Sequence, residues 1–200
     1  MKTNYHELIC IIDRSGSMES IRDDAIGGFN AFINEQKKQP ESTRVTLELF
    51  DDQFDRIYEA MPIDETVPLD EGTFVPRGST ALLDAVGRSL ANAYVRIISL
   101  TAAERPEGVI VAILTDGMEN SSREFDFNAV SDIIAKRRDE SGWEFVFLGA
   151  NQDAIATASK LSMSSDDAVN FAATPEGTRE AYSDMSARVN ERRSRYRSRR

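Results

Sequence analysis

The chain has 200 residues, 40% of them hydrophobic and 29% charged, and carries a formal net charge of −10. These values are ordinary for a soluble globular protein, and the length suits one compact domain. The longest apolar runs, such as residues 109–114, are far shorter than the ~20 residues that span a bilayer. Because no signal-peptide apolar region precedes the first predicted strand, we expect a cytoplasmic protein without a membrane partner.

The net charge hides an asymmetry, because six arginines fall within the last nine residues. Without them the chain holds 18 basic and 34 acidic residues, and such an acidic body argues against broad nucleic-acid binding. The arginine-rich tail has two interpretations: contact with RNA, an acidic partner or the body itself, or a solvated helix end that frays. The sequence favours the second. The six residues are Arg192, Arg193, Arg195, Arg197, Arg199 and Arg200.

The first third of the chain predicts a strand, a helix and a hairpin. Residues 7–12 form an apolar run typical of a parallel strand covered on both faces. Residues 18–39 have the apolar spacing of an amphipathic helix, in which close packing against the sheet would explain Gly27 and Gly28. Residues 45–49 alternate apolar and polar side chains, as in a strand exposed on one face, and residues 54–59 form its return strand.

Between these strands, Asp51, Asp52 and Asp55 are interpreted as a solvated turn. A long loop follows over residues 60–78, a kind of segment that is often functional in a compact domain. The remaining predicted elements are a helix at 81–104, a strand at 109–114, a helix beginning near 127, a strand at 143–148, a short helix around 155–161, an edge strand at 168–171 and a helix from about 175.

This alternation predicts an α/β, doubly wound fold. We expect a mostly parallel central sheet with one antiparallel edge strand and helices on both faces. Residues 1–200 then form a single domain, with its core at about 6–160 and a C-terminal helical extension with the arginine-rich tail at 161–200. The single cysteine, Cys10, lies inside the first apolar run and is interpreted as a small buried hydrophobe.

Polar side chains follow two of the predicted buried strands. Asp13 closes the first, and Asp116 follows the strand at 109–114. In such sheets ligands bind outside the carboxyl ends of the strands. If the two strands are adjacent, both carboxylates and the hydroxyl groups at positions 15, 17 and 80 converge there. Hard oxygen atoms suit a hard cation such as Mg²⁺.

Each of these residues also has an ordinary explanation. Asp13, Ser15 or Ser17 alone would cap the helix that follows, and Thr80 would cap the helix at 81–104. Asp116 before Gly117 is a common turn pair. The metal-site interpretation therefore depends on all of them occurring together at matching strand ends. His6 is the only histidine, so a zinc cluster or catalytic triad that needs two imidazole groups cannot form. The sequence also contains no glycine-rich phosphate-binding loop.

The segment Asp13-Arg14-Ser15-Gly16-Ser17, with Thr80 and the later Thr115-Asp116-Gly117, resembles the metal-ion-dependent adhesion site (MIDAS) of von Willebrand factor type A (vWA) domains. The resemblance covers about residues 6–160 and implies a Rossmann-like fold. It makes Ser15, Ser17 and Thr80 hydroxyl ligands of the metal, with Asp13 and Asp116 acting directly or through water. The implied cofactor is Mg²⁺, or else Mn²⁺ or Ca²⁺.

The resemblance implies a non-enzymatic adaptor that captures an acidic residue of a partner protein in a metal-dependent way. Neutral hydroxyl ligands leave the cation under-neutralised, so a partner's carboxylate can complete its coordination. Residues 77–85 and 147–151 look more like intracellular bacterial and phage members, which commonly serve beside ATPases, kinases or stress-response complexes such as tellurium-resistance-type systems.

Two other functions remain open. A Mg²⁺-dependent phosphatase or phosphotransferase would use Asp13 as its nucleophile, although Ser15 stands where a second carboxylate is expected and no phosphate-binding lysine is evident. Alternatively, the metal only stabilises the loops. Glu119 and Asn120 either shape the rim of the site or cap its loop, and Asp84 either supports the metal ligands or faces solvent.

Overall fold

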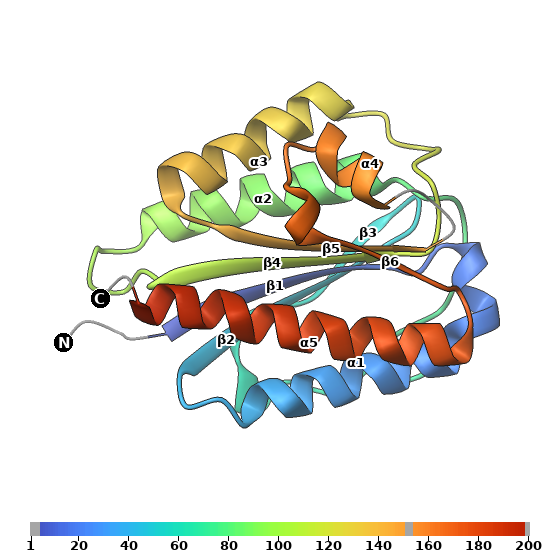
Figure 1. Ribbon diagram of the computed structural model, residues 1–200, viewed down its shortest axis with the longest axis horizontal. Coiled ribbons are helices and arrows are strands. Elements are labelled where there is room, and N and C mark those ends of the chain that lie inside the picture. Colours follow the sequence, from blue (N-terminus) through green and yellow to red (C-terminus); the bar gives the residue numbers. More distant parts are fainter. Residues whose placement is uncertain (1–4, 151–153, 199–200) are drawn as a thin grey trace.

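The fold is a six-stranded sheet with the order β3-β2-β1-β4-β5-β6, seen in a computed structural model whose residues 5–150 and 154–198 are described here (Figure 1). Every neighbouring pair of strands is parallel except β2 and β3, which are antiparallel at one edge. The predicted doubly wound, mostly parallel architecture is therefore confirmed. The strands are β1 (Tyr5–Asp13), β2 (Ser42–Phe50), β3 (Phe54–Pro62), β4 (Gly108–Thr115), β5 (Glu144–Ala150) and β6 (Ala168–Phe171).

Helices cover both faces of the sheet, with α1 and α5 on one side and α2, α3 and α4 on the other (Figure 1). Two helix boundaries differ from the predicted ones: residues 16–21 form a 3-10 turn before α1, and α2 ends at Ser99. No described helix is both long and apolar enough to cross a membrane. The α-helices are α1 (Arg22–Lys37), α2 (Leu82–Ser99), α3 (Phe127–Ser141), α4 (Ala154–Lys160) and α5 (Pro175–Ser198).

The central strands are buried along their whole length because both faces are covered. All residues of β1 and β4 are buried. Successive side chains of β1 enter opposite cores: Cys10 lies in the core beneath α1 and α5, while Ile9 and Ile11 lie in the core beneath α2 and α3. Cys10 is therefore a buried apolar residue, as predicted.

Strand β2 is buried where its alternating sequence predicted one exposed face. The polar side chains Thr46 and Glu48 are only 3% and 1% exposed. Each has a partner on a neighbouring strand: Thr46 Oγ1 donates to Glu7 Oε1 at 3.2 Å, and Arg56 Nε donates to Glu48 Oε1 at 2.8 Å. Buried polar groups are tolerated when they are paired, so alternation did not signal solvent here.

Helix α5 runs along α1 and is part of the main packing. Its apolar side chains Ala181, Tyr182, Met185 and Val189 belong to the core beneath α1 and α5. The helix continues to Ser198, and the basic residues at its end are partly buried in the body. The interpretation of this end as a fraying, solvated tail was therefore wrong for the described residues; Arg199 and Arg200 lie outside them.

The arginines of α5 are held by side chains of the body. Arg193 is completely buried, and its Nη1 donates to Thr43 Oγ1 at 2.7 Å. Three further contacts are Arg192 Nη2 to Asp167 Oδ1 at 2.7 Å, Arg195 Nη1 to Glu144 Oε2 at 3.3 Å and Arg197 Nη1 to Glu41 Oε1 at 3.2 Å. These side chains dock the helix against β2 and the segment before it, and against β5 and the turn before β6. This is the contact with the body that the sequence analysis gave as the less favoured interpretation.

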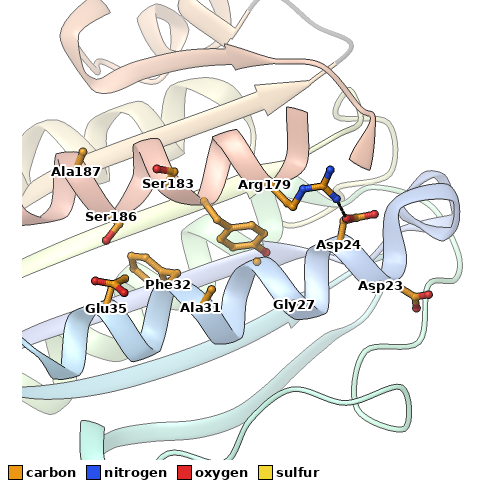
Figure 2. Close-up of a pocket in the computed structure, with 12 residues that line it drawn as sticks. Asp23, Asp24, Gly27, Ala31, Phe32, Glu35, Arg179, Ser183, Ser186 and Ala187 are labelled. Atoms are coloured by element: carbon orange, nitrogen blue, oxygen red, sulfur yellow. Dashed lines mark hydrogen bonds and ion pairs between the residues drawn. The ribbon is translucent and has the colours of Figure 1, made fainter. Parts of the chain in front are cut away.

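Adjacent glycines of α1 have different surroundings, and neither packs against the sheet as predicted. A Cβ added to Gly28 would lie 2.3 Å from Cδ2 of Tyr182 on α5, so this glycine permits close helix–helix approach. Gly27 has no neighbouring atom within 4 Å and lines an open groove of about 550 Å³ between α1 and α5. Figure 2 shows this groove, with Gly27 and Ala31 facing Ser183 and Ser186 and the Arg179–Asp24 ion pair at one end.

We expect Gly28→Ala to lower the free energy of unfolding by about 1–3 kcal/mol, because the added methyl group forces the Tyr182 ring to move. Gly27→Ala is the matched control. It adds a methyl group to open space and removes a glycine from a helix interior, so it should raise stability by about 0.5–1 kcal/mol. Urea denaturation of both variants checks the prediction, and equal effects of the two substitutions would contradict it.

Candidate metal centre

The strand register brings the two candidate aspartates together. Strands β1 and β4 are adjacent and parallel, with Ile12 opposite Leu114, so Asp13 at the end of β1 lies beside the end of β4. Asp116 follows β4 directly. The adjacency on which the predicted site depended is therefore present in the fold. Both residues are buried at the edge formed by the carboxyl ends of the strands.

Asp13 is completely buried, and both of its carboxylate oxygens accept hydrogen bonds. Oδ1 accepts the backbone N–H of Ser15 at 2.7 Å, and Oδ2 accepts the hydroxyl of Thr115 at 2.5 Å. Burial raises the pKa of Asp13 to about 6; those two donors lower it and the carboxylate of Asp116 raises it further. Both of these hydrogen bonds come from neutral donors, so neither supplies a positive charge to the carboxylate.

The hydroxyl groups complete an oxygen cluster around this carboxylate. Ser15 Oγ and Ser17 Oγ are 3.2 Å apart, and Ser17 Oγ donates to Asp116 Oδ1 at 2.6 Å. Thr80 joins them next to Gly117, where an added Cβ would lie 2.9 Å from Thr80 Oγ1 and 3.6 Å from Ser17 Oγ. Burial also raises the pKa of Asp116. All five candidate residues therefore meet at one place.

The donor set fits a hard divalent cation. It consists of three hydroxyl groups and two carboxylates, all of them oxygen donors of the kind that Mg²⁺, Mn²⁺ and Ca²⁺ accept. Within residues 5–150 and 154–198, no group of three or more His, Cys, Asp or Glu side chains is placed to hold a metal. The serine and threonine hydroxyl groups are therefore indispensable to this candidate site. The two buried carboxylates are the charged groups of this set that a cation would contact directly or through water.

The cluster is open on one side. Asp13, Ser15, Thr80 and Asp116 are buried, whereas Ser17 is exposed. Met118, two residues beyond Asp116, is 66% exposed. A group from another molecule therefore reaches the cluster from the side of Ser17 without displacing a core residue.

The loop after β4 is hydrogen-bonded to the start of α2 and to Thr80, which lies just before that helix. Glu119 Oε2 accepts the N–H of Leu83 at 2.9 Å, and Asn120 Oδ1 accepts the N–H of Thr80 at 2.9 Å. The Asp84 carboxylate accepts three backbone N–H groups, those of residues 123–125. Glu119 and Asn120 thus cap and fasten the loop, and Asp84 neither faces solvent nor contacts a candidate ligand in these bonds.

The sequence analysis gave no separate role to Thr115 or Gly117, and it misinterpreted Asp51, which lies beside the site. Thr115 supplies a hydrogen bond to Asp13, and its position directly before Asp116 was the available signal. Gly117 leaves the space between Thr80 and Ser17 open. Asp51, interpreted as part of a solvated turn, is completely buried, because it is paired with arginines from two other segments.

Comparison with known proteins identifies the fold. No protein-family model matches the chain, and no curated protein matches it in sequence. Among solved structures, the vWF domain of the type V pili tip protein Mfa5 from Porphyromonas gingivalis is similar to this chain, with a TM-score of 0.63 and 12% identity. The match covers 94% of this chain and 96% of the Mfa5 domain. The von Willebrand factor type A structure from Catenulispora acidiphila covers 92% of this chain, with a TM-score of 0.57 and 16% identity. This chain has the vWA fold.

A third solved structure with this vWA fold is proximal thread matrix protein 1 from the mussel byssus, described with a zinc-occupied MIDAS motif. It covers 92% of this chain, with a TM-score of 0.60 and 15% identity. The chain spans only 42% of the Catenulispora structure and 45% of the byssus protein. Because the identities are low, the likeness concerns the fold, and the vWA fold places the candidate ligands at the carboxyl edge of the sheet.

Proposed function

We propose that this protein is a non-enzymatic binding module that captures an acidic residue of a partner protein through a divalent metal. Ser15, Ser17 and Thr80 would hold the metal with their hydroxyl groups, and Asp13 and Asp116 would hold it directly or through water. The observation that carries the proposal is the convergence of these five oxygen-bearing side chains at one solvent-open point. When bound, the cation supplies an electrophilic position for a carboxylate.

The arrangement of this chain's own groups supports capture of a partner. Three of the five candidate ligands are neutral hydroxyl groups, and each carboxylate already accepts a hydrogen bond from Thr115 or Ser17, so carboxylates that act through water would leave the cation's direct ligands largely neutral. A carboxylate from outside would add the missing charge through a charge-assisted contact. The exposed side of Ser17 gives that carboxylate access, and Met118 lies nearby for an apolar neighbour in the partner. Mg²⁺ is the expected resident ion, with Mn²⁺ or Ca²⁺ as alternatives.

The surroundings of Asp13 argue against the enzymatic alternative. A nucleophilic aspartate needs one free carboxylate oxygen directed at the substrate. Asp13 is completely buried, and its two oxygens accept hydrogen bonds from Ser15 and Thr115. Attack on a phosphoryl group would require this buried carboxylate to become accessible to the substrate. A binding role in which Asp13 acts through water needs no such exposure.

Affinity capture from a native lysate tests the proposal. We expect wild-type protein in Mg²⁺ to retain a set of proteins that EDTA releases and that Asp116→Ala does not retain, because the substitution removes a metal-binding carboxylate. Asp139→Ala is the matched control, since it removes an exposed carboxylate on α3. Circular dichroism establishes that each variant is folded.

Two results would contradict the proposal. One is an identical set of captured proteins with and without EDTA. The other is full retention by folded Asp116→Ala. Loss of retention by Asp139→Ala would instead indicate a general charge effect of the acidic surface.

A further inference from the structure

Arg14 stands between two candidate metal ligands, Asp13 and Ser15, yet its side chain turns into the protein. That side chain is only 5% exposed, and its guanidinium contacts the carboxylates of Asp51 and Asp55. Arg77 contacts the same two carboxylates from a different loop. We call these four residues, Arg14, Asp51, Asp55 and Arg77, the arginine clasp.

The clasp is centred on one buried oxygen atom. Asp51 Oδ2 lies 3.1 Å from Arg14 Nε and 2.8 Å from Arg77 Nε, and the Asp51 side chain is completely buried. Its other oxygen, Oδ1, accepts the backbone N–H of Gln53 at 2.6 Å. Asp55 is half exposed and closes the cluster, 3.2 Å from Arg77 Nη2 and in contact with Arg14. Two cations and two anions therefore balance one another beside the oxygen cluster.

Backbone hydrogen bonds run parallel to the clasp and join the same three segments. These segments are residues 13–16, which carry ligands, residues 50–51 between β2 and β3, and residues 77–81, which carry Thr80. The bonds run from Arg14 N to Phe50 O at 2.8 Å, from Arg77 N to Arg14 O at 3.0 Å, from Gly16 N to Gly78 O at 3.2 Å and from Ala81 N to Asp51 O at 2.9 Å.

The metal ligands come from three loops, so the site forms only when those loops are ordered. Ordering mobile segments during binding lowers affinity, whereas a cradle ordered beforehand avoids that loss. The clasp fixes the segment of Ser15 to the segment of Thr80 through a buried ion pair, and such a pair is unfavourable to bury unless its geometry is good. Two members of the clasp lie within ligand segments, Arg14 beside Ser15 and Arg77 near Thr80, and of these Arg14 is the buried one.

We propose that Arg14 is a positioning residue that sets the metal affinity of this site. Its guanidinium does not contact the cluster oxygens in any of its described bonds; it acts through Asp51 and Asp55, which lock the Ser15 and Thr80 segments in one arrangement. The inference rests on the proposed function, because it presumes that the oxygen cluster binds a divalent cation.

Calorimetric titration of the chelator-stripped full chain with Mg²⁺ and Mn²⁺ tests this role. Arg14→Met should raise the Kd about tenfold or more, the size of effect that residues supporting metal ligands commonly have. Arg77→Met should have a smaller effect, because that arginine is the exposed arm of the clasp, with 42% of its side chain accessible. The matched control is Met185→Ala, which destabilises the core beneath α5 and should leave the Kd unchanged.

Thermal midpoints of the metal-free variants separate positioning from general destabilisation. If the loss of affinity follows the midpoint alone, Met185→Ala will show it too, and the inference fails. Arg14→Lys keeps the charge but not the planar fork that spans two carboxylates. The Arg14→Lys variant is expected to fold and to bind metal more weakly than wild type. It therefore tests the role of Arg14 if Arg14→Met does not fold.

A folded Arg14→Met or Arg14→Lys variant with wild-type Kd for both metals would overturn the inference and leave the proposed function standing. If the wild-type protein binds neither metal, the proposed function itself fails, and the role of Arg14 fails with it. A wild-type Kd in a folded Arg14 variant therefore distinguishes failure of the Arg14 inference from failure of the proposed function.

Discussion

Asp13→Asn should weaken metal binding and, at the same time, stabilise the metal-free protein. Its carboxylate is completely buried, accepts hydrogen bonds from two neutral donors, and lies near a second carboxylate, Asp116. Asparagine keeps an oxygen for the N–H of Ser15 and removes the charge. We expect the metal affinity to fall by at least about 10–100-fold, and the free energy of unfolding without metal to rise by about 1–3 kcal/mol at pH 7.5.

The pH dependence follows from the direction of the pKa shift. Burial raises the pKa of Asp13 from 3.8 to about 6, so the Asp13 carboxyl group holds its proton more tightly in the folded protein than in the unfolded chain. The charged form therefore destabilises the folded state above about pH 6, and the penalty disappears as the pH falls below about 4. Urea denaturation in EDTA at pH 7.5 and pH 4.5 should show a gain for Asp13→Asn that shrinks at the lower pH.

A different outcome would be informative. If Asp13→Asn is less stable than wild type at both pH values, the hydrogen bonds from Ser15 and Thr115 outweigh the effect of burial, and the carboxylate has a structural role. Asp139→Asn is the control for loss of a negative charge, because it changes an exposed carboxylate on α3. It should alter neither metal affinity nor its dependence on pH.

The two candidate carboxylates that sequence predicted share one property: each lies at or just after the end of an apolar run. The runs that became β1 and β4 fixed where Asp13 and Asp116 would emerge, and parallel strands bring such ends to one edge. Ser15 and Ser17 followed from their short spacing to Asp13, and Thr80 followed from its position before the helix predicted at 81–104 and from the resemblance to vWA domains. Local pattern and topology therefore sufficed for the placement of these side chains.

The parts that sequence did not predict depend on partners far along the chain. Asp51 is charged and sits in a turn, which indicates solvent, but its partner Arg14 is 37 residues away. Glu48 was assigned to an exposed face because its strand alternates apolar and polar residues, and its partner Arg56 lies across the hairpin on β3. The sequence alone indicates that burying a charged residue is unfavourable. The ion pair that offsets this cost becomes apparent only in the folded structure, where the strands and loops come together.

Tyr196, near the end of α5, tests whether the arginine-rich end is docked or frayed. Its ring packs on Gly108, where an added Cβ would lie 2.5 Å away, and its centroid is 5.4 Å from that of His6. Its hydroxyl oxygen lies 2.9 Å from Val109 O and 2.7 Å from Gly142 O. The side chain therefore joins the end of the helix to β1, to β4 and to the segment before β5.

We expect Tyr196→Ala to lower the free energy of unfolding by about 3–5 kcal/mol, because it opens a cavity and removes the hydroxyl donor that two backbone carbonyl groups share. Tyr196→Phe keeps the ring and should cost about 1–2 kcal/mol. Arg197→Ala is the neighbouring control; its side chain is 47% exposed, so loss of its ion pair with Glu41 should cost less than about 1 kcal/mol. If Tyr196→Ala were as mild as Arg197→Ala in urea denaturation, the end of α5 would be frayed in solution. A large, graded difference would show that the described end of the helix is docked on the body.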